Sequence, residues 1–180
     1  MMRARGGDKD AFGALVTPSL GRLHAVARLI LHDEDLAEDA VQDALVDAWR
    51  DLRGLRDPTR FDAWLHRVTV HACYSLARRQ SRHRVREINA RVDDPIAPHD
   101  AARSVELTDE LDRGLRRLPT DQRALVVLVY YLDLPVAEAA DTLGIPFGTA
   151  KSRLHRAINA LRAELAAIAR ETTIARGGVA

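Results

Sequence analysis

Residues 143–157, LGIPFGTAKSRLHRA, interrupt a chain that follows helical periodicity on both sides. Gly144 can adopt the left-handed conformation that ends a helix without steric cost, and Pro146 prevents the helix from continuing. Gly148 and Thr149 then allow a new helix to begin with a hydroxyl group near its N-terminus. A helix, a short glycine-containing turn and a second, basic helix form a helix-turn-helix, which can place the second helix in the major groove of DNA.

The segment after the turn has an apolar back and a polar front. At about 100° per residue, three apolar side chains fall within about 40° of Leu154 and form the expected buried face with it: Ile158, Leu161 and Leu165. The side chains roughly opposite are Ser152, Arg156 and Asn159, and His155 lies beside them. Arg156 suits guanine, whereas Thr149, Lys151 and Arg153 suit phosphates. A surface helix whose polar face meets only water fits the same pattern, but the preceding turn favours DNA.

The rest of the chain predicts an all-α protein with two small helical domains joined by a flexible linker. The 180 residues are 47% apolar but only 4% aromatic, which favours helices with aliphatic seams over sheets. Pro18 and Gly21 are expected to interrupt the first helical stretch, and Trp49 belongs to an apolar seam. Thr120 or Asp121 is a plausible helix N-cap. The predicted organisation is a first domain at 1–82, a linker at 83–103, a second domain at 104–170 and a tail at 171–180.

Charge is segregated along the chain, although the net charge is only +1. Residues 33–47 contain seven acids and no lysine or arginine, whereas residues 78–91 contain six arginines against one glutamate. Residues 93–112 contain seven acids against one arginine, and residues 147–170 contain five bases against one glutamate. A single block is explained by a solvated helix face. Four alternating blocks predict separate surfaces for different partners.

A second basic pattern follows the helix predicted at about 59–82. Its members recur at i, i+4, i+7 and i+11 and continue into two further arginines: Arg67, His71, Tyr74, Arg78, Arg79 and Arg82. Basic side chains interleaved with an aromatic ring and a histidine suit contacts with a nucleic-acid backbone and with exposed bases. The alternative is a solvated stripe in which Tyr74 is half-buried packing.

Several function classes are not favoured by the sequence. No nucleophile–base pair, phosphate-binding loop or metal cluster is visible, so we expect neither an enzyme nor a bound cofactor or metal. The single cysteine, Cys73, fits a reducing cytoplasm and has no second cysteine or paired histidine at metal spacing. No run of 18 apolar residues occurs, and the first residues lack an apolar signal core, so we expect a cytoplasmic protein with no membrane insertion.

These motifs, in this order, resemble the extracytoplasmic-function (ECF) class of the bacterial sigma-70 family. The resemblance extends from ARGGDKDAFGALV near the N-terminus to RAINALRAEL near the C-terminus. DLAEDAVQDALVDAWRDL and RFDAWLHRV look like the polymerase-binding helix of sigma region 2 and the start of its promoter-reading helix. LGIPFGTAKSRLHRA looks like the helix-turn-helix of region 4. Three motifs in the right order are more specific than one helix-turn-helix.

The resemblance implies a sigma factor that binds core RNA polymerase, recognises the −35 and −10 elements of promoter DNA and starts promoter melting. It places contacts with the clamp helices of the largest polymerase subunit at Asp35, Asp39, Gln42, Asp43 and Asp47. It places −35 contacts at Thr149, Lys151, Ser152, Arg153, His155 and Arg156. It places −10 contacts at Arg53, Arg56, Arg67, His71, Tyr74, Ser75, Arg78, Arg79 and Arg82. The flap of the second-largest subunit and an anti-sigma factor are further partners implied by the resemblance.

The resemblance also assigns the segments between these helices. The loop LRGLRDPTR matches the one that captures an unstacked non-template base, and the acidic part of the linker would enter the channel that RNA later occupies. The chain departs from many family members at His71 and Ser75, where asparagine and aspartate are frequent, which leaves its −10 preference open.

Two other readings remain open on the residues alone. An autonomous helix-turn-helix regulator would use residues 105–170 to bind an operator without polymerase, with residues 1–82 as a sensor or dimerisation domain. A helical adaptor would use its charged faces to bind proteins only, and substitution of Lys151 or Arg156 would leave its activity intact.

Overall fold

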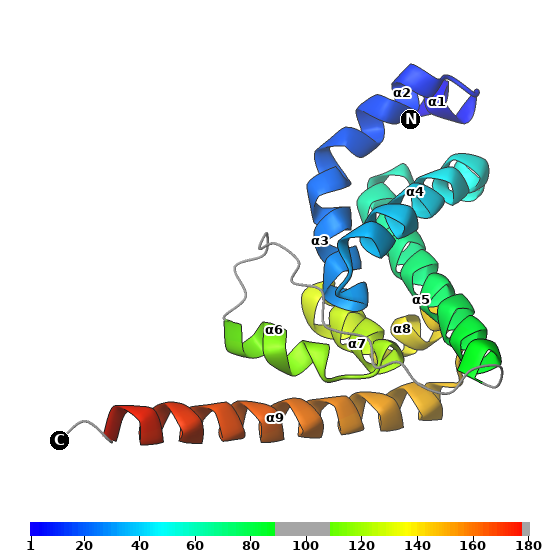
Figure 1. Cartoon of the computed structure of the whole chain (residues 1–180). Helices are drawn as coiled ribbons and strands as arrows, with labels where there is room; N and C mark the ends of the chain where they lie inside the picture. The colour runs from blue at the N-terminus through cyan, green and yellow to red at the C-terminus, as the bar shows by residue number, and fades with distance from the viewer. Residues whose placement is uncertain (89–108, 178–180) are drawn as a thin grey trace. The chain divides into compact units, whose positions relative to one another are not determined.

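The computed structural model describes the backbone of residues 1–88 and 109–177 and the side chains of residues 1–81, 110–168 and 170. The chain divides into two compact units, Met1–Ala102 and Arg103–Ala180. Every regular element in the described residues is helical, so the predicted all-α class is confirmed (Figure 1).

The first unit is built around three long helices, α3 to α5, that pack on one another. Its elements are α1 (Met2–Arg5), α2 (Lys9–Val16), the 3₁₀ turn η1 (Thr17–Ser19), α3 (Leu20–Leu31), α4 (Glu34–Asp51), the 3₁₀ turns η2 (Leu52–Gly54) and η3 (Pro58–Arg60), and α5 (Phe61–Ile88). Leu23, Ile30 and Leu65 are completely buried between these helices. Each such side chain contributes about 1.5–3 kcal/mol relative to an exposed position, so the core holds α4 and α5 in fixed register.

Local signals define where the helices of this unit begin and end. The carboxylate of Asp33 accepts a hydrogen bond from the Leu36 amide at 3.0 Å and caps α4. Pro18 falls in the 3₁₀ turn between α2 and α3, which confirms the predicted interruption. The interruption predicted at Gly21 is wrong, because this exposed glycine lies inside α3 and continues its helical backbone. A glycine in a helix costs only about 1 kcal/mol, which the buried face of α3 offsets.

The span Lys9–Leu31 has the length and mean hydropathy of a membrane-crossing helix. In the fold it is two helices joined by the turn at Thr17–Ser19, and its α3 portion supplies core side chains such as Leu23 and Val26. Its apolar character is therefore explained by packing inside the first unit.

Two helices end later than the sequence indicates. Helix α5 reaches Ile88, six residues beyond its predicted end, and α9 reaches Gly177, inside the predicted tail. Residues 83–88 and 171–176 lack an apolar seam but also lack glycine and proline, so nothing in them stops helix propagation. The remainder of the predicted linker, with its acidic part, lies outside the described residues.

The second unit consists of four helices and one π-helical turn in its described part (Figure 1). They are α6 (Asp109–Arg116), α7 (Thr120–Val126), the turn η4 (Val127–Tyr131), α8 (Val136–Leu143) and α9 (Phe147–Gly177). Leu125 and Leu128 are completely buried, and α6, α7 and α8 all contact α9. Gly114 permits the approach of α6, because a Cβ atom there would lie 3.1 Å from Cδ2 of Leu161.

The start of α7 differs from the predicted N-cap. Pro119 occupies the cap position without a side-chain hydrogen bond, and Thr120 is the first helical residue. The Thr120 hydroxyl instead accepts a hydrogen bond from the buried guanidinium of Arg123 at 3.1 Å. Burial, and then the neighbouring Arg116, lower the pKa of Arg123 to about 10, which still leaves it charged at neutral pH.

Candidate nucleic-acid and protein interfaces

The turn between α8 and α9 has the geometry that the sequence predicts. Gly144 adopts φ 62° and ψ 38°, and its amide donates to the carbonyls of Ala140 and Asp141. The Ile145 amide also donates to the Ala140 carbonyl, at 3.1 Å, so the turn satisfies the carbonyls of Ala140 and Asp141 in the last turn of α8. Helix α9 begins at Phe147, directly after Pro146. The pair α8–α9 is therefore a helix-turn-helix.

The N-terminal half of α9 has one buried face and one exposed polar face. Ala150, Leu154, Ala157 and Leu161 are buried, whereas Ile158 and Leu165 are half-buried. The exposed face carries hydrogen-bond donors and acceptors: Lys151, Ser152, His155, Arg156 and Asn159. The Asn159 amide and the His155 ring meet at 3.0 Å, so these two side chains support each other on the surface. This division is what a helix needs to pack by its back and read a groove by its front.

Two −35 candidates are less exposed than the others. Thr149 is half-buried, and its carbonyl accepts a hydrogen bond from the Ser152 hydroxyl at 3.0 Å. Arg153 is also half-buried, and its guanidinium lies 3.1 Å from the carboxylate of Asp121 on α7, in an ion pair without hydrogen-bond geometry. The position of Arg153 beside the buried face directs its side chain to α7, where the ion pair helps to hold the helix, and its −35 contact stays a prediction.

Phe147 is a surface feature that the sequence does not reveal. It is the first residue of α9 and is 56% exposed. On a helical wheel it lies about 20° from Leu154, which predicts burial. The structure exposes it because it lies one turn before Ala150, where the packed back of α9 begins. An apolar ring thus stands at the N-terminal end of the candidate recognition helix.

Helix α4 separates small apolar residues from acidic ones. The five predicted polymerase contacts are all exposed: Asp35, Asp39, Gln42, Asp43 and Asp47. The opposite face buries Ala37, Ala40, Val41, Ala44 and Ala48, whose small side chains allow α3 and α5 to approach closely. The carboxylate of Asp43 lies 3.1 Å from the guanidinium of Arg79 on α5, and both side chains are more than half exposed. Such a pair contributes about 0–1 kcal/mol, so either partner can exchange it for another.

An apolar patch borders this acidic face. Val46 is 47% exposed and lines a shallow hollow with Lys9, Phe12, Leu45 and Trp49. Trp49 is half-buried and meets the ring of Phe12 edge-to-face, with 5.1 Å between ring centroids. The expectation that Trp49 belongs to the core is therefore only partly met, because one side of the indole lines the hollow at the surface.

The basic stripe on α5 is only partly exposed. His71, Arg78 and Arg79 are exposed, whereas Arg67 and Ser75 are half-buried. Tyr74 is buried, with 7% of its surface exposed, and the guanidinium of Arg78 lies 5.6 Å from its ring centroid. Its burial favours packing over a direct contact with DNA, and the −10 contact of Tyr74 stays a prediction. Tyr74 lies one helical turn after the buried Val70, so its ring faces the core and packs against the guanidinium of Arg78. The Arg82 side chain lies outside the described residues.

The loop between α4 and α5 presents two arginines. Arg53 and Arg56 are both exposed, and the Arg53 Nε donates to the carbonyl of Arg5 at 3.1 Å. Asp57 caps the following turn by accepting hydrogen bonds from the amide and hydroxyl of Thr59, which lower its pKa. The loop therefore has a defined shape in the absence of DNA.

No metal or thiol chemistry is indicated in the described residues. No three His, Cys, Asp or Glu side chains in them come together as a metal site. Cys73 is completely buried, and burial raises the pKa of its thiol to about 12. The thiol therefore stays protonated at neutral pH and is not a reactive group.

Comparisons with known proteins show the family of the chain. The model of sigma-70 region 2 matches residues 15–83, and that of sigma-70 region 4 matches residues 108–161. The ECF RNA polymerase sigma factor SigM of Mycobacterium tuberculosis (H37Rv) is 37% identical over 151 residues, which cover 84% of this chain and 75% of SigM. The chain belongs to the ECF class of the sigma-70 family. The region 2 match contains α3, α4 and most of α5, and the region 4 match contains the helix-turn-helix.

Other ECF sigma factors extend the likeness over most of the chain. SigW of Bacillus subtilis is 28% identical, and the match covers 88% of this chain and 91% of SigW. Among solved structures, the sigma factor RpoE of Bartonella quintana, in complex with the anti-sigma factor NepR, is 30% identical with a TM-score of 0.63, covering 86% of this chain and 96% of RpoE. CnrH, in complex with the cytosolic domain of CnrY, is 29% identical with a TM-score of 0.57, covering 92% of this chain and 94% of CnrH.

Proposed function

We propose that this ECF sigma factor recruits core RNA polymerase through the acidic face of α4 and directs it to promoters through α9, α5 and the loop between α4 and α5. The observation that carries the proposal is the exposed polar face at the start of α9. Its donors follow the glycine turn, while its apolar back is packed against α6, α7 and α8. The chain acts as a specificity subunit and has no catalytic role of its own.

In the second unit, the exposed face of α9 reads the −35 element. Arg156 can donate two hydrogen bonds to the O6 and N7 atoms of a guanine, the commonest specific contact in the major groove. Lys151, Ser152 and His155 lie on the same exposed face, where they reach bases or phosphates. Thr149, at the helix start, suits a phosphate that approaches the positive end of the helix dipole. Arg153 supports this surface through Asp121.

In the first unit, the loop at 52–60 and the exposed side of α5 bind the −10 element. Arg53 and Arg56 on the loop and Arg78 and Arg79 on α5 provide positive charge for the backbone of the non-template strand. His71 is exposed at the centre of the stripe and can donate, accept or stack. Half-buried Arg67 and Ser75 lie next to it on the helix. Capture of one flipped base offsets an unstacking cost of a few kcal/mol and starts melting.

The acidic face of α4 and the basic stripe of α5 serve different partners within the first unit. Asp35, Asp39, Gln42, Asp43 and Asp47 face solvent together, which suits basic side chains of the polymerase clamp helices. The flap of the second-largest subunit is the proposed partner of the second unit. We place the protein in the cytoplasm, where polymerase and promoters are found.

An anti-sigma factor is a further proposed partner. Among the solved relatives, RpoE is in complex with the anti-sigma factor NepR, and CnrH is in complex with the cytosolic domain of CnrY. In this chain, an inhibitor that covers the acidic face of α4 and the adjoining hollow at Val46 would block polymerase. Its identity would have to be established by co-purification of the tagged full chain.

The proposed function is tested by selection from a random promoter library with holoenzyme assembled from core polymerase and this chain. Wild-type holoenzyme should select two conserved hexamer-like elements, and Arg156→Ala should lose a guanine preference in the upstream one. Arg162→Ala is the matched control, because Arg162 is exposed on α9 but lies almost two turns further from the turn. Tight binding of the free chain to a symmetric site without core would contradict the proposal and favour an autonomous regulator.

A further inference from the structure

Helix α1 is joined to the loop between α4 and α5 by two reciprocal contacts. The Nη2 group of Arg5, the last residue of α1, donates to the carbonyl of Leu55. The Nε group of Arg53, in the same loop, donates to the carbonyl of Arg5 at 3.1 Å. These contacts connect residues 48 to 50 positions apart in the chain. A four-residue helix has no stability of its own, so its place in the fold depends on such contacts.

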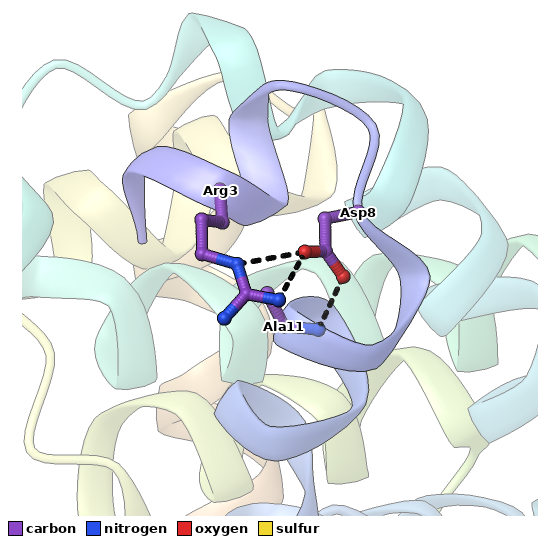
Figure 2. Close-up of polar contacts among 3 residues, drawn as sticks. All are labelled: Arg3, Asp8 and Ala11. Carbon is purple, nitrogen blue, oxygen red and sulfur yellow. Dashed lines mark hydrogen bonds and ion pairs between the residues drawn. The ribbon is translucent and has the colours of Figure 1, made fainter.

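The other side of α1 is fastened to α2. The guanidinium of Arg3 forms an ion pair with the carboxylate of Asp8 at 2.7 Å, and the same carboxylate accepts the Ala11 amide at 2.9 Å (Figure 2). These hydrogen bonds, that of the Ala11 amide first, lower the pKa of Asp8, so the N-cap of α2 is charged at neutral pH. Ala4 is buried, and Gly7, with φ 94°, turns the chain between the two helices. Helix α1 is therefore a bridge from α2 to the loop.

The centre of the loop, residues 53–56, is less restrained than its end, where Asp57 accepts two hydrogen bonds from Thr59. Within the loop, the Leu55 amide donates to the Leu52 carbonyl at 3.3 Å, and the backbone of Leu55 is extended, with φ −68° and ψ 106°. Leu52 anchors the start of the loop in the core, whereas Arg53, Gly54 and Arg56 are exposed. A hydrogen bond from a charged donor is stronger than one between neutral groups. The contact from Arg5 to Leu55 is thus the main external restraint on the centre of the loop.

We propose that Arg5 is a positioning residue that holds the loop at 52–60 in the shape that captures a flipped promoter base. The inference rests on the proposed function of that loop. A loop ordered before binding loses less conformational freedom when the base enters, so capture is tighter. The backbone carbonyl of Arg5 also accepts the hydrogen bond from the Arg53 Nε, so Arg53 is tied to the end of α1. No direct contact between Arg5 and DNA is required.

The test compares Arg5→Ala and Arg5→Lys with wild-type chain in full holoenzyme. The matched control is Arg3→Gln, which changes an arginine of the same helix that pairs only with α2. Promoter opening is followed by 2-aminopurine fluorescence in the −10 element, and core affinity by anisotropy of labelled chain. Arg5→Ala should reduce the opening equilibrium about tenfold, because it removes one charge-assisted hydrogen bond. Arg5→Lys should recover part of the loss, and Arg3→Gln should reduce opening less than Arg5→Ala does, because the Arg3 side chain is 80% exposed and its ion pair is weak.

An abasic scan of the non-template −10 strand separates positioning from general weakening. Wild-type holoenzyme should lose most opening at the one position whose base enters the loop. In Arg5→Ala that loss should largely disappear, since a loop that captures poorly gains little from the base. Equal abasic losses in wild type and Arg5→Ala would overturn the inference, as would wild-type opening that is insensitive at every position. If Arg5→Ala lowers core affinity, Arg5→Gln, which keeps most of the side chain, replaces it in the same scan.

These outcomes are distinct from failure of the proposed function. Wild-type holoenzyme that neither binds nor opens a selected promoter would contradict the function itself. Normal opening by wild type together with normal opening and normal abasic losses in Arg5→Ala would contradict only the role of Arg5.

Discussion

The turn that ends α8 offers a quantitative test of how the helix-turn-helix is built. Gly144 adopts φ 62°, and no atom lies within 4 Å of the position that a Cβ would take. Gly144→Ala is therefore expected to be destabilising through backbone strain alone. A left-handed conformation costs a non-glycine residue about 1–2 kcal/mol, and the reduced freedom of the unfolded chain returns about 0.4–1 kcal/mol. The net loss is about 1 kcal/mol.

For a unit of this size, a loss of about 1 kcal/mol lowers the melting temperature by about 4–8 °C. Thermal unfolding of the full chain, followed by circular dichroism, measures this shift. Gly144→Asn should cost less, because asparagine tolerates the left-handed region. Gly148→Ala is the matched control: Gly148 is helical with open space around it, so alanine should stabilise the unit by up to about 1 kcal/mol. Equal effects of alanine at positions 144 and 148 would refute the reasoning.

Three further outcomes follow from buried and paired groups in the first unit. Burial lowers the pKa of His66 below 6.5, so the folded state binds fewer protons than the unfolded state, and stability should fall as pH drops below 6.5. The free energy of unfolding in urea should therefore differ less between pH 7.5 and pH 5.5 in His66→Gln than in wild type. An equal difference in the two proteins would contradict this. Because burial raises the pKa of Cys73 to about 12, the thiol should react with a disulfide reagent only in denaturant, and rapid labelling of native protein would count against the packing. Asp43→Ala should change the free energy of unfolding by no more than about 1 kcal/mol, because the ion pair of Asp43 with Arg79 is exposed. The same substitution should weaken binding to core polymerase, measured by anisotropy. Unchanged affinity would remove Asp43 from the proposed contacts.

Local chemistry made much of the fold predictable. Gly144 and Pro146 determine the turn by backbone geometry alone, and the alternation of alanine and aspartate on α4 determines which face is buried. The sequence also placed the exposed polar residues of α9, because helical periodicity separates them from Leu154 and Leu161. Where the burial of a side chain depends only on its own helix, helical periodicity was sufficient to predict it.

The sequence did not reveal a side chain's surroundings where a second element decides them. Tyr74 follows a basic stripe in sequence, but packing in the first unit buries it. Arg153 looks like a phosphate ligand, but Asp121 from another helix binds it. The contact of Arg5 with the loop joins residues 50 positions apart, and no periodicity signals it. Helix ends at Ile88 and Gly177 were missed because an apolar seam is needed for packing, not for helix propagation.

The central claim is that this ECF sigma factor brings core RNA polymerase to promoters and starts transcription. Run-off transcription from a selected promoter tests it most directly, with purified core and full chain as the only proteins. Wild-type chain should yield a transcript of defined length, and Asp39→Lys and Arg156→Ala should each reduce it while Arg162→Ala should not. Absence of a transcript with wild-type chain and active core, or equal transcript from all variants, would contradict the account.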